Sequence, residues 1–174
     1  MAIHIIIDGY NLIRQSPDLA RLDRQDLQLG REALVTMLAA YKKIKPHAIT
    51  VVFDGADQPS LYGSRDRARG IAIRYSQGGE SADDLIRRMA RKERAKALVV
   101  SSDREVMAAA EAAGATSMTS PAFEEKLVMA RYVSVKGGGE MVESNGWVPT
   151  TRKKGPSRRL PKRKRRSNAR VKKL

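Results

Sequence analysis

The chain has 174 residues, of which 41% are hydrophobic, which is enough for one domain with a proper core. The absence of cysteine excludes a disulfide framework, a thiolate metal site and a cysteine nucleophile, and two histidines are too few for a histidine-rich zinc site. Lys and Arg exceed Asp and Glu by 34 to 19, but residues 151–174 hold thirteen of these basic residues and no acidic one, so the rest of the chain is nearly neutral.

No stretch of the sequence approaches the roughly 20 apolar residues that span a bilayer. The amino-terminal apolar run is too short for the core of a signal peptide and lacks a basic lead-in. We therefore expect a protein of the cytoplasm that does not enter a membrane.

Apolar runs alternate along the chain with segments of helical periodicity. The runs predict strands over residues 3–7, 49–53, 71–75, 98–100 and 115–118. Their nearly continuous hydrophobicity is typical of parallel strands that are buried on both faces. Helices are predicted over residues 27–43, 82–90, 106–113 and 123–132. This alternation predicts an α/β fold of three layers with a mainly parallel sheet.

Three of the predicted strands lead into an aspartate, namely Asp8, Asp54 and Asp103. The carboxyl ends of parallel strands lie at one edge of a sheet, where ligands bind in such folds. Three distant parts of the chain would thus bring carboxylates to one place. Each aspartate, and Asn11 after the first, also fits an ordinary turn or helix cap.

A fourth acidic group opens the helix predicted from residue 82. Ser81 and Asp84 fit a capping box, which leaves Asp83 and Glu80 to face a metal. Because this helix leads into the strand that ends at Asp103, its amino terminus should lie at the same edge of the sheet. Carboxylates without cysteine or histidine favour Mg²⁺ or Mn²⁺, which support phosphodiester hydrolysis.

Other chemistries lack their motifs. There is no Gly-x-Gly-x-x-Gly after the first strand, no P-loop and no Gly-x-Ser-x-Gly elbow. His4 lies within an apolar run, so we interpret it as a packed core or edge residue.

Basic residues indicate a nucleic-acid partner. The long loop predicted over residues 55–69 and the strand after it contain Arg65, Arg67, Arg69 and Arg74. The tail contains the consecutive cations Lys162, Arg163, Lys164, Arg165 and Arg166. With so few apolar groups the tail is predicted to be disordered and to bind RNA through counterion release. A nuclear import signal or a general binder of acidic surfaces is the alternative for this segment.

The motifs resemble a known family. Ile-Ile-Asp8-Gly-Tyr-Asn11-Leu-Ile, Val-Phe-Asp54-Gly, Glu80-Ser-Ala-Asp83-Asp84 and Val-Val-Ser-Ser102-Asp103 are similar, in order and spacing, to the YacP-like group of NYN domain proteins, relatives of the PIN-domain ribonucleases. The resemblance covers about residues 2–135. It implies a PIN-like sheet of order 3-2-1-4-5 and endoribonuclease activity with Mg²⁺ or Mn²⁺, directed in some members at translated mRNA on the ribosome. The acids that it implies as metal ligands are Asp8, Asp83 and Asp103, with Asn11, Asp54, Glu80, Asp84 and Ser102 supporting them.

We therefore predict a nuclease domain over residues 1–135, a linker or extension over 136–150 and a basic disordered tail over 151–174. The predicted function is metal-dependent hydrolysis of RNA, linked to mRNA decay, RNA processing or the ribosome. The alternatives are a non-catalytic RNA-binding or ribosome-associated factor with the same fold, and a DNA nuclease.

Overall fold

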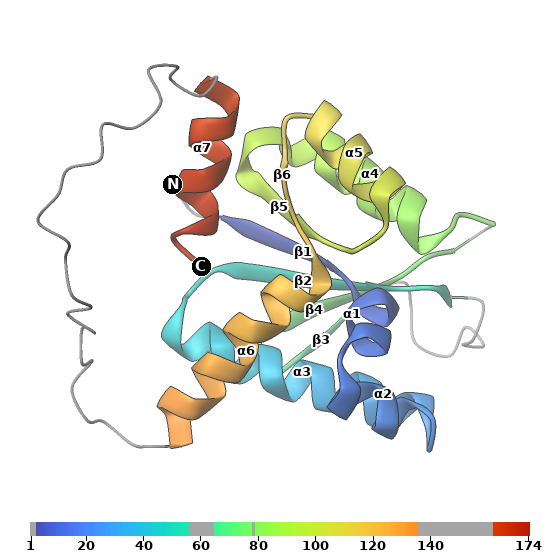
Figure 1. Cartoon of the computed structure of the whole chain (residues 1–174). Helices are drawn as coiled ribbons and strands as arrows, with labels where there is room; N and C mark the ends of the chain where they lie inside the picture. Colours follow the sequence, from blue (N-terminus) through green and yellow to red (C-terminus); the bar gives the residue numbers. More distant parts are fainter. Residues whose placement is uncertain (1–2, 56–64, 78, 136–161) are drawn as a thin grey trace, which may run out of the picture.

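A six-stranded sheet forms the middle layer of the protein, whose computed structural model describes residues 3–55, 65–77, 79–135 and 162–174 (Figure 1). The strands lie in the order β3-β4-β2-β1-β5-β6. Every neighbouring pair is parallel except β3 and β4, which are antiparallel. The strands are β1 (His4–Asp8), β2 (Ala48–Phe53), β3 (Arg65–Ala68), β4 (Ile71–Tyr75), β5 (Ala97–Val100) and β6 (Thr116–Met118).

Helices cover both faces of this sheet (Figure 1). One face packs against α1 (Gly9–Gln15), α3 (Leu27–Ile44) and α6 (Ser120–Val135), with α2 (Pro17–Asp23) beside α3. The other face packs against α4 (Ala82–Glu93) and α5 (Arg104–Ala112), and the short 3₁₀ turn η2 (Arg94–Lys96) leads from α4 into β5. None of the helices in the described ranges is long and apolar enough to cross a membrane.

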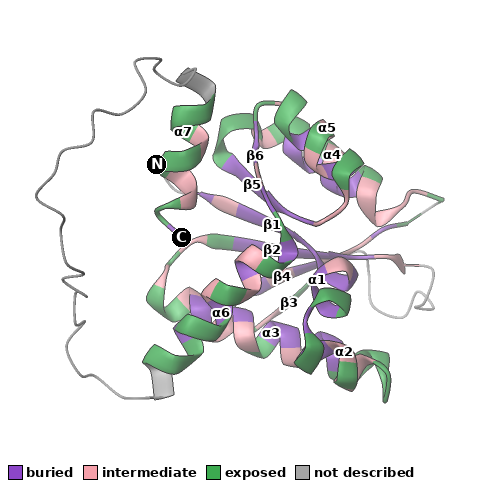
Figure 2. Ribbon diagram, viewed as in Figure 1, coloured by how far each residue is buried: buried purple, intermediate pink, exposed green. Residues whose placement is uncertain are grey.

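The two helical layers explain why the strands are apolar throughout. In β1, Ile5 and Ile7 pack with α1, α3 and α6, whereas Ile6 between them packs with α4 and α5. All three isoleucines are fully buried, and the strands of the central sheet are buried along most of their length (Figure 2). Successive residues of a strand face opposite sides, so a strand covered on both faces needs an unbroken apolar run.

The predicted sheet order of 3-2-1-4-5 is confirmed for the five predicted strands, which are β4, β2, β1, β5 and β6. The strand β3 was not predicted: it occupies the end of the predicted loop over residues 55–69 and adds a sixth strand at the edge of the sheet. Charged side chains are common on edge strands, and they hide the apolar alternation by which a strand is recognised. Residues 56–64 of that loop lie outside the described residues.

The prediction of disorder in the basic tail is corrected by the structure for residues 162–174. Residues Lys162–Val171 form a helix, α7, and the chain then continues to Leu174, which is only 7% exposed. Val171 packs beside Leu174 on the core, and the Tyr41 hydroxyl donates a hydrogen bond of 3.1 Å to the Leu174 carbonyl oxygen. Lys, Arg and Ala favour helices, and burial of two apolar side chains supplies the tertiary packing that the composition of the tail concealed.

Substituting Leu174 by Ala should lower the free energy of unfolding by about 2 kcal/mol, because it empties the buried position that anchors α7. Urea denaturation followed by circular dichroism measures this change. Lys172→Ala, at an exposed position of the same segment, is the control and should change stability by less than about 0.5 kcal/mol. Equal stabilities of the two variants would contradict the docking of α7.

Candidate active site

A pocket of about 450 Å³ lies at the carboxyl ends of β1 and β2 and at the start of α4 and α5. Four carboxylates from four separate segments line it, those of Asp8, Asp54, Asp83 and Asp103. The expected gathering of acids at this edge of the sheet is therefore present. The other lining residues are Tyr10, Asn11, Arg14, Gln15 and Ala82.

Asp8 lies at the centre of this arrangement, as the last residue of β1 and the N-cap of α1. It is only 8% exposed. One carboxylate oxygen accepts the Asn11 backbone N–H at 3.1 Å, and the other accepts the Ser101 hydroxyl at 3.1 Å. A Cβ at Gly9 would overlap the Phe53 ring, so glycine is needed there for close packing between α1 and β2.

Ser101 connects the two aspartates of the central strands, β1 and β5. Its hydroxyl group donates a hydrogen bond to Asp8, and the hydroxyl oxygen accepts the Asp103 backbone N–H at 3.1 Å. Asp103 itself caps α5, because one of its oxygens accepts the backbone N–H groups of Glu105 and Val106 at 2.7 and 3.0 Å. The capping interpretation of Asp103 is thus confirmed, and it coexists with a place in the pocket. Ser101, which is fully buried, was not predicted as a site residue, although its place between an apolar run and Asp103 is a signal that the sequence offers.

Asn11 holds together the loops that carry the acids. Its side-chain oxygen accepts the Ser102 backbone N–H and the Ser120 hydroxyl, both at 2.8 Å. Ser102 also contacts the start of α6, where its hydroxyl oxygen accepts the Ser120 backbone N–H at 3.2 Å. Ser102 therefore lies beside the pocket without lining it, and its support for the site runs through Asn11.

At the start of α4, Asp84 takes part in the helix cap and Asp83 lines the pocket, as predicted for these two residues. Ser81 and Asp84 form the cap: the Ser81 hydroxyl accepts the Asp84 N–H at 3.1 Å and donates to its carboxylate at 2.9 Å. Asp83 lines the pocket instead. Glu80 departs from the prediction, because it does not line the pocket and forms an ion pair of 3.0 Å with Arg88.

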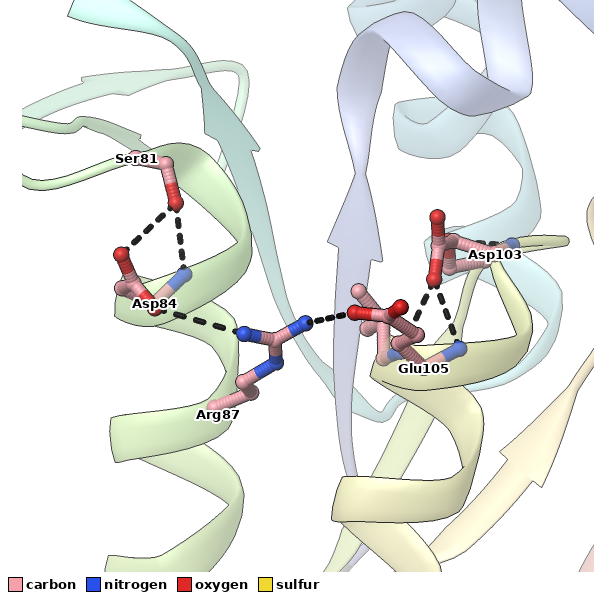
Figure 3. Close-up of polar contacts among 7 residues, drawn as sticks. Ser81, Asp84, Arg87, Asp103 and Glu105 are labelled. Carbon is pink, nitrogen blue, oxygen red and sulfur yellow. Dashed lines mark hydrogen bonds and ion pairs between the residues drawn. The ribbon is translucent and has the colours of Figure 1, made fainter.

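Arg87 joins the helices that carry Asp83 and Asp103, and Figure 3 shows it between Asp84 and Glu105. Its guanidinium nitrogens lie 3.4 Å from an Asp84 oxygen and 3.5 Å from a Glu105 oxygen. These are long, partly exposed contacts, so each is weak by itself. Together they span the first turns of α4 and α5.

Asp54 lies one strand away from Asp8, on β2's side of the site. It accepts a hydrogen bond of 3.1 Å from the Ser76 hydroxyl, which also accepts the Gly55 N–H at 3.0 Å. A Cβ at Gly55 would overlap the Ser76 carbonyl oxygen, so the chain turns tightly here only with glycine. Asp54 lines the pocket together with the other three aspartates, and its supporting role stays a prediction.

Crowding and burial change the proton affinity of two acids in the pocket. Burial is the main cause that raises the pKa of Asp8 above its usual value, and the nearby charges of Asp83 and Asp103 raise it further, against the hydrogen bonds from Asn11 and Ser101. Burial also raises the pKa of Asp83, followed by repulsion from Asp103. Outside the pocket, the Ser81 hydrogen bonds lower the pKa of Asp84. The pocket therefore concentrates carboxylates that disfavour one another's ionisation.

The pocket offers the carboxylate oxygens that a hard cation prefers, but these oxygens are not already arranged around one ion position. Carboxylate oxygens are the ligands that Mg²⁺ and Mn²⁺ prefer, and a bound cation would relieve the repulsion among them. Within the described residues, however, no three acidic or histidine side chains are gathered closely enough to hold one ion by themselves. Mg²⁺ commonly binds through one or two carboxylates and keeps several waters, so such a cluster is not required.

One wall of the pocket was missed because residues 9–15 read as a turn and not as a helix. In α1, Tyr10 and Arg14 lie one turn apart, and the Arg14 guanidinium carbon lies 5.6 Å from the centre of the Tyr10 ring. Arg14 is exposed and is the cation that lines this acidic pocket in the described chain. The spacing of apolar Leu12 and Ile13 beside polar Asn11 and Arg14 is the signal that could have indicated the helix.

Behind this wall lies a buried arginine. Arg31 is 4% exposed, and its guanidinium lies 5.3, 5.5 and 5.8 Å from the ring centres of Tyr10, Phe53 and Tyr75. It also donates a hydrogen bond to the Tyr10 hydroxyl. These contacts with the rings offset part of the cost of burying the charge and fix the Tyr10 ring beside Arg14.

The predicted RNA-binding arginines do not line the pocket, and the antiparallel register of β3 carries Arg67 and Arg69 away from it, towards the amino end of β4. Arg67 and Arg69 are exposed on or just after β3, and Arg74 is half-buried on β4. Arg74 is aligned with Val52 and through it with Asp8, two strand spacings or about 10 Å away. Arg65 is paired with Arg74 in the backbone register.

The basic residues of α7 lie at the other end of the sheet. Lys164, Arg165 and Arg166 are exposed there, beside the start of β1 (Figure 1). For Lys162 and Arg163 the structure gives only their place in the helix backbone. His4 is structural, as expected, with hydrogen bonds of 2.6 Å to Glu93 and 2.8 Å to Thr50.

The stability of the protein should depend on pH through Asp8. Because its pKa is raised in the folded state, the folded protein binds this proton more tightly than the unfolded chain, and the carboxyl opposes folding increasingly as pH rises from 3.8 through the folded pKa. The difference in the free energy of unfolding between Asp8→Asn and the native protein should therefore shift in favour of the variant between pH 4 and pH 7, by on the order of 1 kcal/mol. Urea denaturation at both pH values measures this.

Asp84→Asn is the control, with the opposite sign, because a lowered pKa stabilises the fold as pH rises. If the stability difference between Asp8→Asn and the native protein were the same at pH 4 and pH 7, burial would not be acting on this carboxyl.

Comparisons with known proteins agree with this fold. The chain is 27% identical over 86 residues to the uncharacterized protein YacP of Bacillus subtilis (strain 168), a match that covers 49% of this chain. The chain thus spans about half the length of that curated relative. Two crystal structures of Rae1 (YacP) from Bacillus subtilis, one of a point mutant, show the same fold. One has a TM-score of 0.66 at 23% identity, covering 78% of this chain and 79% of that one. The mutant has a TM-score of 0.65 at 20% identity, with coverage of 77% and 80%.

The family model that matches is the YacP-like NYN domain, over residues 5–170. The match runs well past residue 135, where the resemblance of the motifs ended, and includes most of α7. The chain therefore belongs to the YacP-like NYN domain family, and its fold is a PIN-like, nuclease-type domain.

Proposed function

We propose that the protein is a metal-dependent endoribonuclease that hydrolyses RNA phosphodiester bonds. The observation that carries this proposal is the convergence of Asp8, Asp54, Asp83 and Asp103 on one pocket at the point where the sheet reverses its winding, between β1 and β5. Membership of a nuclease-type family supports hydrolysis of a nucleic acid as the reaction.

Asp8, Asp83 and Asp103 are the residues that would hold Mg²⁺ or Mn²⁺. A bound ion of this kind lowers the pKa of its water and neutralises charge on a phosphate. The protein's own part is to hold the acids in place. Ser101 fixes Asp8 relative to Asp103, and the Asn11 contacts hold the loop that follows β5.

Arg14 is placed to bind the phosphate that is cleaved. An acidic pocket alone repels the RNA backbone, and a guanidinium within it offers charge-assisted hydrogen bonds to phosphate oxygens. The Tyr10 ring supports the Arg14 side chain, and buried Arg31 holds that ring. Arg67, Arg69 and Arg74 would guide the RNA backbone along β3 and β4 towards this point.

One observation favours the alternative of a non-catalytic RNA-binding factor with the same fold. No ready cluster of three metal-binding side chains is found among the described residues. The two functions differ in whether RNA is cut when a divalent cation is added.

The purified protein should cleave a mixed RNA pool with Mn²⁺ or Mg²⁺ and stop when the ion is chelated. The double variant Asp8→Asn, Asp103→Asn should lose at least about 100-fold in rate, since the carboxylates that would hold the ion are gone. Gel analysis of product ends measures cleavage, and circular dichroism checks the fold. Undiminished cleavage by the double variant would refute the proposed site, and absence of cleavage by the native protein would favour the binding factor.

Substituting Arg14 by Gln should reduce cleavage by about 10- to 100-fold, the loss expected for a charged hydrogen bond to phosphate. Arg21→Gln is the matched control, because Arg21 is an exposed arginine of the neighbouring helix α2 that does not line the pocket. Single-turnover rates at saturating protein measure the chemical step. Equal rates for the two variants would remove Arg14 from the mechanism.

A further inference from the structure

A second charged site lies at the opposite end of the sheet, between α7 and the amino ends of the strands. A pocket of about 380 Å³ is lined there by four cations, Lys96 of η2 and Arg166, Arg170 and Lys173 of the α7 segment. No acidic residue lines it. A neighbouring pocket of about 630 Å³ shares Arg166 and Arg170 with it. We call the two together the α7 groove.

The cations of the groove lack acidic partners within the described chain. The groove cations are five, and none of them takes part in an ion pair there: Lys96, Lys164, Arg166, Arg170 and Lys173. Glu111 is the acid that lines the second pocket, and its carboxylate accepts a hydrogen bond from Ser117. Gathering five like charges along one groove is unfavourable unless an anion compensates them.

The groove is built into the fold and is not a property of a free tail. Arg170 donates a hydrogen bond of 3.1 Å to the Thr116 hydroxyl at the start of β6, and the two apolar anchors, Val171 and Leu174, pack on the core. This docking brings α7 against Lys96, which belongs to a segment about 70 residues earlier in the sequence.

The arrangement favours a polyanion over a single small anion. Arg166, Arg170 and Lys173 are spaced four and then three residues apart, so they follow one side of the segment over about 10 Å. A row of cations of this length matches successive phosphates of a nucleic-acid backbone. Arginine and lysine side chains that remain partly exposed bind such a backbone by releasing its counterions.

The groove and the acidic pocket lie at opposite ends of β1. Ile3 lines the groove and Asp8 lines the acidic pocket, which separates the two sites by about 17 Å along the strand. We propose that the α7 groove binds the phosphate backbone of RNA at a stretch remote from the bond that is cut. In taking RNA as the ligand, this inference rests on the proposed function. The groove then acts as an anchor for RNA long enough to reach both ends of the sheet.

The test measures RNA binding without cleavage, in the presence of a chelator. The triple variant Lys96→Gln, Arg166→Gln, Lys173→Gln removes three groove cations and leaves Arg170 to hold Thr116. Its matched control removes three exposed cations elsewhere, by substituting Arg21, Arg24 and Lys43 with Gln. Thermal unfolding checks that both variants keep the native stability. Binding is followed by fluorescence anisotropy with a labelled RNA of about 24 nucleotides.

The groove variant should bind this RNA at least tenfold more weakly than the native protein. Its slope of log affinity against log salt concentration should flatten by about 2, the loss of three phosphate contacts to a single strand. The control should change affinity less than threefold. Equal affinity and slope for the two variants would overturn the proposal. Competition by AMP or inorganic phosphate as strong as competition by RNA would also overturn it, because the groove would then be a small-anion site.

Two further measurements separate this inference from the proposed function. The groove variant should cleave an RNA of about six nucleotides at the native rate, and it should cleave the long RNA with a raised KM and an unchanged kcat. Bound RNA should protect Lys96 and Lys173 from acetylation but leave Lys43 reactive. If the protein shows this protection but does not cleave RNA, the groove proposal is supported and the nuclease proposal is refuted. Acetylation of all three lysines to the same extent with and without RNA would refute the groove.

Discussion

The buried carboxylate of Asp8 is the group on which the rest of the site depends. It ends the central strand, caps the first helix and is linked through Ser101 to Asp103 on the neighbouring strand. Because Asp8 is buried, hydrogen bonds must replace the hydration that its carboxylate loses, and these come from the Asn11 backbone N–H and the Ser101 hydroxyl. The same hydrogen bonds that stabilise Asp8 determine where the other acids can lie.

Stability and function oppose each other at this edge of the sheet. Burial raises the pKa of Asp8 and Asp83, and the neighbouring carboxylates raise it further, so the arrangement costs stability at neutral pH in the absence of a cation. The fold offsets this with contacts that hold the acidic segments apart and in register. Asn11 links β5's end to α6, and Arg87 spans the starts of α4 and α5.

The two ends of the parallel sheet carry opposite charge. Carboxylates collect where the strands end, and the cations of α7 collect where they begin. This polarity depends on one tertiary contact, the docking of Val171 and Leu174 beside α3 and α6. With α7 docked, the most basic segment of the chain becomes a fixed surface, and the distance between the two charged sites follows from the length of β1.

Sequence alone determined five of the six strands, the class of the fold and the aspartates at the edge of the sheet, because continuous apolar runs and acids that follow them are local patterns. The family motifs added the order of the strands. The helix α1 with Arg14, the edge strand β3 and the helix α7 were not predicted. These segments are too polar or too short to show the hydrophobic periodicity of a helix or a strand. Only tertiary packing decided them: α1 is held by Leu12 and Ile13 in the core, β3 by its pairing with β4, and α7 by buried Leu174 and partly buried Val171. Tertiary structure also decided which acids reach the pocket. Asp83 and Glu80 are three residues apart in the sequence, yet Asp83 lines the pocket and Glu80 pairs with Arg88.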